Sequence, residues 1–156
     1  MSIEKVKAYF ASKGMQERVM ELEVSSATVD LAAQALGVDG SRIAKTLSFS
    51  VEGKPVLVVA AGDARIDNAK FKGFFHTKAK MLAHEEAAEL IGHGVGGVCP
   101  FAVNEGEAVY LDESLKRFQT VFPACGSSNS AIELTIAELE EHSGSLQWVD
   151  VCKNWE

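Results

Sequence analysis

The feature that most constrains the fold is a pair of apolar segments joined by a short turn. Ile43–Ser50 and Val56–Ala61 are rich in β-branched and other apolar residues, and they flank Glu52-Gly53-Lys54, which is typical of a tight turn. Strands joined in this way must run antiparallel, because a parallel pair needs a much longer crossover connection. The sequence therefore predicts a β-hairpin as a central element of the fold.

Helix and strand signals alternate along the rest of the chain. Helices are expected over Ser2–Lys13, Val29–Leu36, Asp67–Phe75 and Ala83–Ile91, and from the capping box Thr135-Ile136-Ala137-Glu138 onward. Further strands are expected over Val19–Val24, Lys78–Met81, Val109–Asp112, Thr120–Ala124, Ala131–Thr135 and Leu146–Val151. This pattern predicts an α/β chain of the mixed α+β type, in which peripheral helices surround a mixed sheet.

Length and composition are those of a globular domain. The chain has 156 residues, 47% apolar and 24% charged, so we expect a single domain over residues 1–156. We expect no targeting segment, and the longest apolar run, Pro55–Gly62, is much shorter than the ~20 residues of a membrane span. Three cysteines without a CxxC pair favour a reducing compartment, the cytoplasm.

The charge is unevenly distributed. The net charge of −7 argues against an extended nucleic-acid footprint and against DNA as a partner. Between Arg65 and Lys80, however, there are five cations and one anion, a local charge of +4. This basic segment either holds a phosphate or two or forms the solvated face of a helix, and charge alone leaves both interpretations open.

The segment Gly92–Phe101 is rich in glycine. Gly92, Gly94 and Gly97 match GxGxxG, but a dinucleotide site requires that pattern between a strand and a helix. Here a predicted helix precedes the segment and Pro100 follows the glycines, so we reject a Rossmann site. Glycine permits close backbone approach to a ligand and proline restricts the end of the loop, which favours a recognition loop over a plain connection.

Lys45 lies within the first strand of the hairpin. Strand alternation places it on the same face as Leu47 and Phe49, where a lysine is unusual. It is either a cation at the rim of a cleft, suited to a phosphate or carboxylate, or an edge-strand lysine that reaches water. The residues alone leave both interpretations open.

The remaining polar residues form no recognisable catalytic or metal-binding motif. The histidines lack HxxxH and HExxH spacing, so no metal is expected. Cys99 and Cys125 are candidate nucleophiles with His93 as a base, but buried structural cysteines are the preferred interpretation. The polar segment Gly126–Ser130 is either a ligand site or a turn.

Several segments, in the order in which they occur, resemble one known family. They are Thr28–Ala33 with Gly37-Val38, Ile43–Phe49, Leu57–Asp63, the GxxxP segment Gly96–Pro100, and the late turn and strand Gly126–Leu134. From about Met15 to Val151 the chain is similar to the YbaK/EbsC family. Its members are free-standing relatives of the editing insertion domain of bacterial prolyl-tRNA synthetase.

The resemblance implies a fold, an activity and a partner. The fold would be a mixed, barrel-like sheet with surrounding helices. The activity would be trans-editing hydrolysis of the ester of misacylated tRNA, typically tRNA for proline carrying a wrong small amino acid, without a cofactor. The terminal ribose hydroxyl would assist the attack in place of a protein nucleophile. The partner would be the acceptor end of aminoacyl-tRNA, with transient association with a synthetase and no membrane.

The resemblance also implies a set of site residues. Lys45 would hold the 3′-terminal adenosine at its phosphate, Gly96 would orient the scissile ester through its backbone, and Pro100 would keep the loop in shape. The expected substrate-binding residues are Gly97, Val98, Cys99, Ser128 and Asn129. Two alternatives stay open: a non-catalytic sensor of an amino acid or aminoacyl-tRNA on the same fold, and a thiol-dependent hydrolase that uses Cys99 or Cys125.

Overall fold

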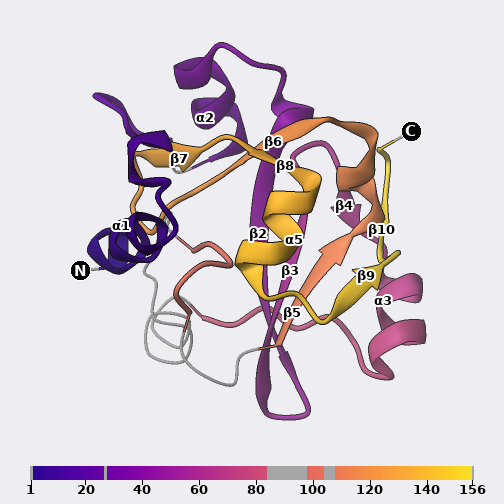
Figure 1. The fold of residues 1–156 in the computed structure, drawn as a ribbon. Coiled ribbons are helices and arrows are strands. Elements are labelled where there is room, and N and C mark those ends of the chain that lie inside the picture. The colour runs from indigo at the N-terminus through magenta and orange to yellow at the C-terminus, as the bar shows by residue number, and fades with distance from the viewer. Residues whose placement is uncertain (1, 27, 84–97, 104–107, 156) are drawn as a thin grey trace.

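A mixed β-sheet forms the centre of the computed structural model, which describes residues 2–26, 28–83, 98–103 and 108–155 (Figure 1). Its strands follow in the order β8-β6-β2-β3-β5-β9. Their bounds are β2 Ile43–Val51, β3 Lys54–Ala61, β5 Ala108–Asp112, β6 Thr120–Pro123, β8 Leu134–Thr135 and β9 Gln147–Val149. The β2–β3 and β6–β8 pairs are antiparallel and the other neighbours are parallel. The sheet curls into a half-barrel, which confirms the predicted mixed α+β class.

Helices and two small strand pairs surround this sheet. The helices are α1 Ser2–Ser12, α2 Val29–Leu36, α3 Asn68–Phe75 and α5 Ile136–Ser143, with short 3-10 helices η1 Gln16–Arg18, η2 Gly40–Arg42 and η3 Glu113–Arg117. The strand pairs are β1 Val19–Glu21 with β7 Ser130–Ile132, and β4 Arg65–Ile66 with β10 Cys152–Lys153. In Figure 1, α1 and α3 lie on opposite sides of the β2–β3 hairpin. None of the described helices combines the length and apolar character needed to cross a bilayer.

The β2–β3 hairpin forms as predicted. Val56–Ala61 is buried over its whole length, which is why this strand is apolar without alternation. Glu52 and Gly53 make the turn with φ values of 52° and 80°, and positive φ at both positions suits a two-residue hairpin turn. The pairing runs from Ala44 opposite Ala61 to the turn, so the hairpin carries β2 through the middle of the sheet.

Aromatic and aliphatic side chains from three helices share one hydrophobic core with the hairpin. Phe10 of α1 contacts Phe101 with ring centroids 5.0 Å apart, and Phe71 of α3 contacts Phe49 at 4.8 Å. Leu139 of α5 is fully buried in the same core. Burying each such side chain contributes about 1.5–3 kcal/mol, so these helices are held by packing on the sheet.

The helix caps expected from the sequence are confirmed. The hydroxyl of Thr28 accepts from the amide of Leu31 at 3.1 Å, and Gly37 ends α2 with φ of 68°. Thr135 and Glu138 form the capping box of α5, each side chain accepting from the other residue's amide. Local sequence signals therefore determine where these two helices begin.

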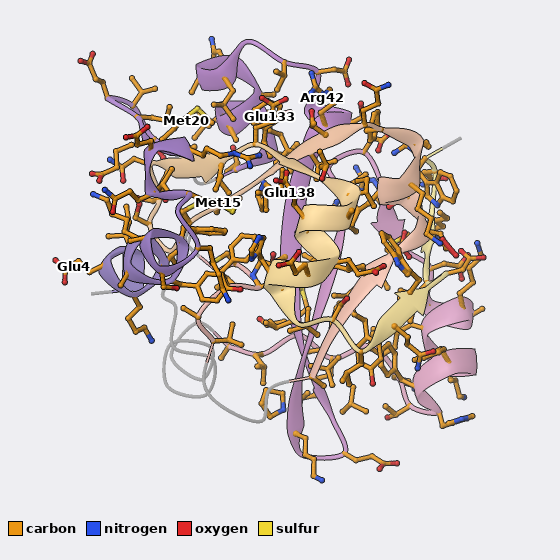
Figure 2. All side chains as sticks on the ribbon, in the orientation of Figure 1. Glu4, Met15, Met20, Arg42, Glu133 and Glu138 are labelled. Carbon is orange, nitrogen blue, oxygen red and sulfur yellow. The ribbon has the colours of Figure 1, made fainter. Side chains whose placement is uncertain are left out.

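One predicted strand is wrong. Ala131–Thr135 is divided at Glu133, so that β7 pairs with β1 and β8 pairs with β6. The carboxylate of Glu133 accepts from the hydroxyl of Thr120 at 2.6 Å and from the guanidinium of Arg42 at 3.3 Å; Figure 2 shows Glu133 beside Arg42. These polar contacts draw the residue out of a continuous strand, which apolar periodicity could not reveal.

Other boundaries also differ from the prediction. Lys78–Met81 is not a strand, and only Met81 makes an isolated bridge, to Phe49. The strands predicted over Val19–Val24 and Leu146–Val151 are shorter, and β4, β10 and η3 have too few residues to give a periodic signal. The helix predicted over Ala83–Ile91 lies, apart from its first residue, outside the described residues.

Candidate functional site

The candidate site lies along an open part of one edge of β2. The opposite edge pairs with β3 over almost the whole strand, whereas this edge pairs with β6 only at its first two residues. Further along, the backbone of Ser48 and Ser50 hydrogen-bonds to residues 80–82, with N···O distances of 3.0 and 2.8 Å. Residues 45–47 lie between these two pairings, and no described strand pairs with them there.

A cavity of about 390 Å³ opens at this part of β2. That volume falls within the range of small-molecule sites, ~300–1,000 Å³. The polar residues of its lining are Ser26, Thr28, Lys45, Thr46, Ser48 and Ser130, and the other lining residues are apolar. The described lining contains no carboxylate, imidazole or thiol. The cavity can therefore recognise a ligand through hydroxyl and backbone groups, but it offers no described acid–base pair.

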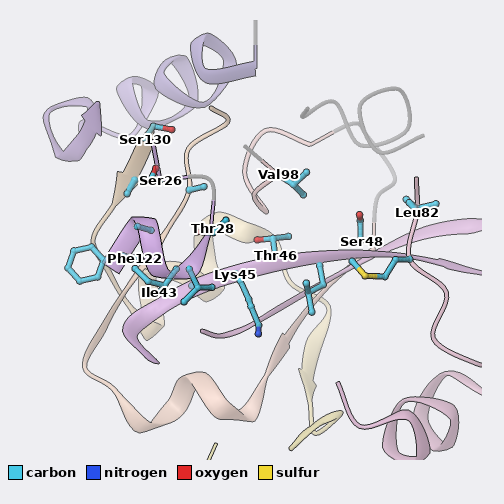
Figure 3. A pocket seen from close by; sticks show the side chains of 17 residues that line it. Ser26, Thr28, Ile43, Lys45, Thr46, Ser48, Leu82, Val98, Phe122 and Ser130 are labelled. Atoms are coloured by element: carbon cyan, nitrogen blue, oxygen red, sulfur yellow. The ribbon is translucent and has the colours of Figure 1, made fainter. Parts of the chain in front are cut away.

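Thr46 is the polar residue that most clearly requires a partner. Its Oγ1 is buried and has no hydrogen-bond partner among the described residues. Figure 3 shows the Thr46 side chain pointing from β2 toward Val98. By strand alternation its backbone N–H and C=O point away from β3, as those of Ser48 and Ser50 do. An unsatisfied buried hydroxyl costs about 1–3 kcal/mol, so a polar ligand in the cavity would stabilise this arrangement.

Lys45 extends from β2 in the opposite direction to Thr46 (Figure 3). Its ammonium donates to the carbonyl of Gly62, at 3.4 Å, and to that of Ala64. An ammonium has three N–H donors, so these two contacts leave one for a further acceptor. Burial lowers the pKa of Lys45; nearby Cys152 opposes this effect and Arg65 adds to it. Lys45 is thus a half-buried cation at the edge of the cavity.

The turn that receives the Lys45 ammonium is closely packed. A Cβ atom at Gly62 would lie 2.0 Å from the carbonyl oxygen of Gly40, so only glycine fits there. The amide of Ala61 donates to the hydroxyl of Ser114 at 3.1 Å. The buried carboxylate of Asp112 accepts from the amides of Ser114 and Val151, at 2.9 and 3.0 Å. Backbone packing and buried hydrogen bonds thus hold the lysine's acceptors in place.

The predicted glycine-rich loop is only partly described. Val98 lines the cavity. Pro100, two residues later in the chain, is buried. Cys99 is fully buried, and its sulfur lies 3.8 Å from the carbonyl oxygen of Phe101. Gly96 and Gly97, like His93, lie outside the described residues. The roles predicted for these two glycines therefore stay predictions.

The predicted polar turn is held against the segment before α2. The side-chain amide of Asn129 donates to the carbonyl of Leu22 at 3.1 Å, and the carbonyl of Ser128 accepts from the amide of Ser26 at 2.6 Å. The next residue, Ser130, lines the cavity. Substrate binding by Ser128 and Asn129 stays a prediction. Sequence reasoning included Ser130 only in a segment left open between a ligand site and a turn, and it missed Ser26 and Thr46. Of these residues, only Thr46 could have been found from the sequence, because strand alternation places it on the opposite face from Lys45.

The cysteines have the properties of structural residues. Cys99, Cys125 and Cys152 are free thiols and fully buried. Burial raises the pKa of Cys99 and of Cys152 to about 12, and it also raises the pKa of Cys125. Because the thiolate is the reactive form, these cysteines are poor nucleophiles near neutral pH. The thiol-dependent hydrolase is therefore disfavoured.

Comparison with known proteins shows which family the chain belongs to. The family model described as "Aminoacyl-tRNA editing domain" matches residues 23–142, which include β2 and its open edge. The chain belongs to the aminoacyl-tRNA editing domain family. The match confirms the resemblance seen in the sequence, and it covers every described residue that lines the cavity.

Relatives of this editing domain include free-standing proteins and parts of larger enzymes. The chain is 57% identical over 157 residues to "Uncharacterized protein YwhH" of Bacillus subtilis (strain 168), and the alignment covers all of both chains. It is 25% identical to the proline–tRNA ligase of Pediococcus pentosaceus, over 87% of this chain and 24% of the ligase. The chain thus corresponds to about a quarter of that ligase.

Solved structures show the same fold. A crystal structure described as "a putative trans-editing enzyme for prolyl tRNA synthetase" is 31% identical, with a TM-score of 0.87 and 97% of each chain covered. "Hypothetical protein APE2540" is 30% identical, with a TM-score of 0.83 over 96% of this chain and 99% of that one. The editing domain therefore has the architecture of free-standing proteins of similar length.

Proposed function

We propose that this chain hydrolyses the ester between a wrong amino acid and the 3′ end of a tRNA, with tRNA for proline as the expected carrier. The observation that carries the proposal is the buried hydroxyl of Thr46, which has no partner among the described residues and lies at the open edge of β2, in a cavity of ligand size. Family membership and the similarity to proline–tRNA ligases support this substrate class. Such a substrate implies action in the cytoplasm.

The cavity and Lys45 suit the two ends of an aminoacyl-adenosine. The hydroxyl and outward backbone groups of Thr46 would hydrogen-bond the aminoacyl end, together with Ser130. The remaining N–H of Lys45 would bind the terminal phosphate. A substrate that crosses the open edge of β2 would contact both residues, which point in opposite directions from adjacent positions. Gly96 would orient the ester through its backbone and Pro100 would keep the loop in shape, as the resemblance implies.

The chemistry requires little from protein side chains. Water adds to the ester carbonyl carbon, the bond from that carbon to the ribose oxygen breaks, and the ribose oxygen takes up a proton. Because the described lining has no acid–base pair, positioning and electrostatic stabilisation would supply the catalysis. The neighbouring hydroxyl of the terminal ribose would assist the attacking water.

The basic segment Arg65–Lys80 would contact the acceptor stem. Lys72 and Lys78 are exposed and line a second cavity beside α3, whereas Lys70 is paired with Asp150 at 3.1 Å. Residues 80–82 connect this surface to the open edge of β2 through backbone hydrogen bonds. Phosphates of the stem could therefore lie on these lysines while the 3′ end enters the cavity.

A panel of tRNAs mischarged with small amino acids tests the proposal. We expect release of at least one amino acid above the spontaneous rate, and no release from any member would contradict the proposal. The absence of a described acid–base pair also fits a non-catalytic sensor on the same fold. Thermal stabilisation by an uncleavable aminoacyl-adenosine analogue, without turnover of any mischarged tRNA, would favour the sensor.

A further inference from the structure

Asp63 and Arg117 form a fork-shaped ion pair beside the turn after β3. The guanidinium donates to both carboxylate oxygens of Asp63, at 3.0 and 2.6 Å, and also to the carbonyl of Trp155. Its central carbon lies 4.8 Å from the ring centroid of Phe118 and 5.2 Å from that of Trp155. Bidentate geometry and two aromatic contacts restrict this arginine far more than an ordinary surface pair.

The carboxylate of this pair belongs to the middle residue of the turn that receives Lys45. Asp63 lies between Gly62 and Ala64, whose carbonyls both accept from the Lys45 ammonium. Arg117 ends η3, the same short helix whose Ser114 hydroxyl accepts from the amide of Ala61. Helix η3 therefore holds this turn at two points, on either side of the Gly62 carbonyl.

Neither member of the pair lies among the described residues that line the cavity. Asp63 and Arg117 are therefore not placed to contact the aminoacyl end of the substrate directly. The charged and titratable groups that act on Lys45 come from the turn and from the neighbouring strands: Asp63, Arg65 of β4 and Cys152 of β10. A shift of the turn would change both the direction of the Lys45 ammonium and its surroundings.

We infer that Asp63 and Arg117 are positioning residues for Lys45, because they fix the turn whose carbonyls hold its ammonium. The inference rests on the proposed function, and it adds how the ammonium of Lys45 is held in position. A misplacement of about 1 Å in a binding group can cost on the order of a hundredfold in rate, so a turn fixed from outside the cavity affects activity.

The chain contains a matched control pair. Arg18 donates to both carboxylate oxygens of Glu138, at 2.7 and 2.9 Å, and to the carbonyl of Glu133 at 2.7 Å. This pair has the same fork geometry and the same third contact to a backbone carbonyl. It lies at the start of α5 and contacts neither Lys45 nor its turn.

The first experiment is a double-mutant cycle on kcat/KM with a mischarged tRNA. We expect Arg117→Gln to lower kcat/KM by on the order of tenfold, and Arg18→Gln to have little effect. In a Lys45→Ala background, Arg117→Gln should cause no further loss, because its effect passes through Lys45. Equal losses in both backgrounds would overturn the inference. Asp63→Asn, with Glu138→Gln as its control, repeats the cycle if Arg117→Gln folds poorly.

A second readout does not depend on activity. The ε-CH₂ NMR signal of Lys45, assigned with Lys45→Arg, reports the pKa of the amine in the intact chain. We expect this pKa to rise toward 10.5 in Arg117→Gln and to stay unchanged in Arg18→Gln, since only the former releases the ammonium from its buried place. An unchanged titration in Arg117→Gln would overturn the inference even in a protein that deacylates. A shifted titration in a protein without deacylation would contradict only the proposed function.

Discussion

The backbone of Gly62 lies directly against the backbone of Gly40, so that a methyl group on Gly62 would come within 2.0 Å of the Gly40 carbonyl oxygen. The same methyl would lie 2.8 Å from Cγ1 of Val29 in α2. Since Val29 also lines the cavity, this contact joins the turn that holds Lys45 to the wall of the cavity. Glycine at position 62 is therefore required by close approach, not by an unusual φ.

Gly62→Ala should destabilise the protein by about 1–3 kcal/mol, because a backbone carbonyl cannot move aside as a side chain would. The matched control is Gly73→Ala in α3, where an added Cβ meets nothing within 4 Å. That change should stabilise the protein by about 0.5–1 kcal/mol, since alanine favours helix. Urea unfolding measures both values, and a Gly62→Ala protein as stable as the wild type would contradict the close contact.

Thr46→Val should separate stability from activity. The substitution keeps the shape and removes a buried hydroxyl that has no described partner, so the free energy of unfolding should stay the same or rise. If the hydroxyl binds substrate, deacylation should fall by up to about tenfold. Thr135→Val provides the contrast, because it removes the N-cap of α5 and should cost about 1 kcal/mol without changing kcat/KM. Retained activity in Thr46→Val would refute the assigned role.

Lys45→Met should abolish most deacylation while the protein stays folded. Burial lowers the pKa of Lys45 below 10.5, so the unfolded chain binds more protons in the interval between the lowered value and 10.5. Stability should therefore rise with pH across that interval in the wild type, and this rise should be absent in Lys45→Met. Wild-type activity should fall as pH rises through the lowered pKa, because the phosphate-binding charge is lost. Thermal unfolding and kcat/KM against pH check both effects.

The Arg18–Glu138 pair should make the stability of the protein depend on pH in the acid range. The Arg18 guanidinium and the capping amide of Thr135 lower the pKa of Glu138 from 4.5 to about 2. A lowered carboxyl pKa stabilises the fold above 4.5, and that contribution is lost as pH falls toward 2. Because the pair is largely exposed, the effect should be modest. Glu138→Gln should flatten the Tm profile between these pH values, and a profile identical to wild type would contradict this account.

The cysteines should be protected in the native protein. Iodoacetamide at neutral pH should label Cys99 and Cys125 far more slowly in the folded chain than in urea, because burial raises both pKa values. Deacylation should survive the native treatment. Rapid native labelling that removes activity would restore the thiol-dependent alternative. Mass spectrometry of the labelled peptides measures the rates.

Much of the fold could be predicted because its signals are local. The hairpin turn at Glu52-Gly53, the Thr28 cap of α2 and the capping box of α5 each depend on a few neighbouring residues, and all three are confirmed. The division of Ala131–Thr135 could not be predicted, because Glu133 turns to partners that are distant in the sequence. The same holds for β4 and β10, which pair across most of the chain.

For the candidate site, too, some features follow from the sequence and others only from the tertiary structure. The sequence by itself determined the family, the mixed α+β class and the unusual position of Lys45, since these follow from residue types and their order. Only the tertiary structure decided that no described strand pairs with the edge of β2 at Thr46 and that the Lys45 ammonium is held by the Gly62–Ala64 turn. Pairing of a strand edge, and contact between a lysine and carbonyls of the next strand's turn, depend on how distant segments pack, and no local pattern records that packing.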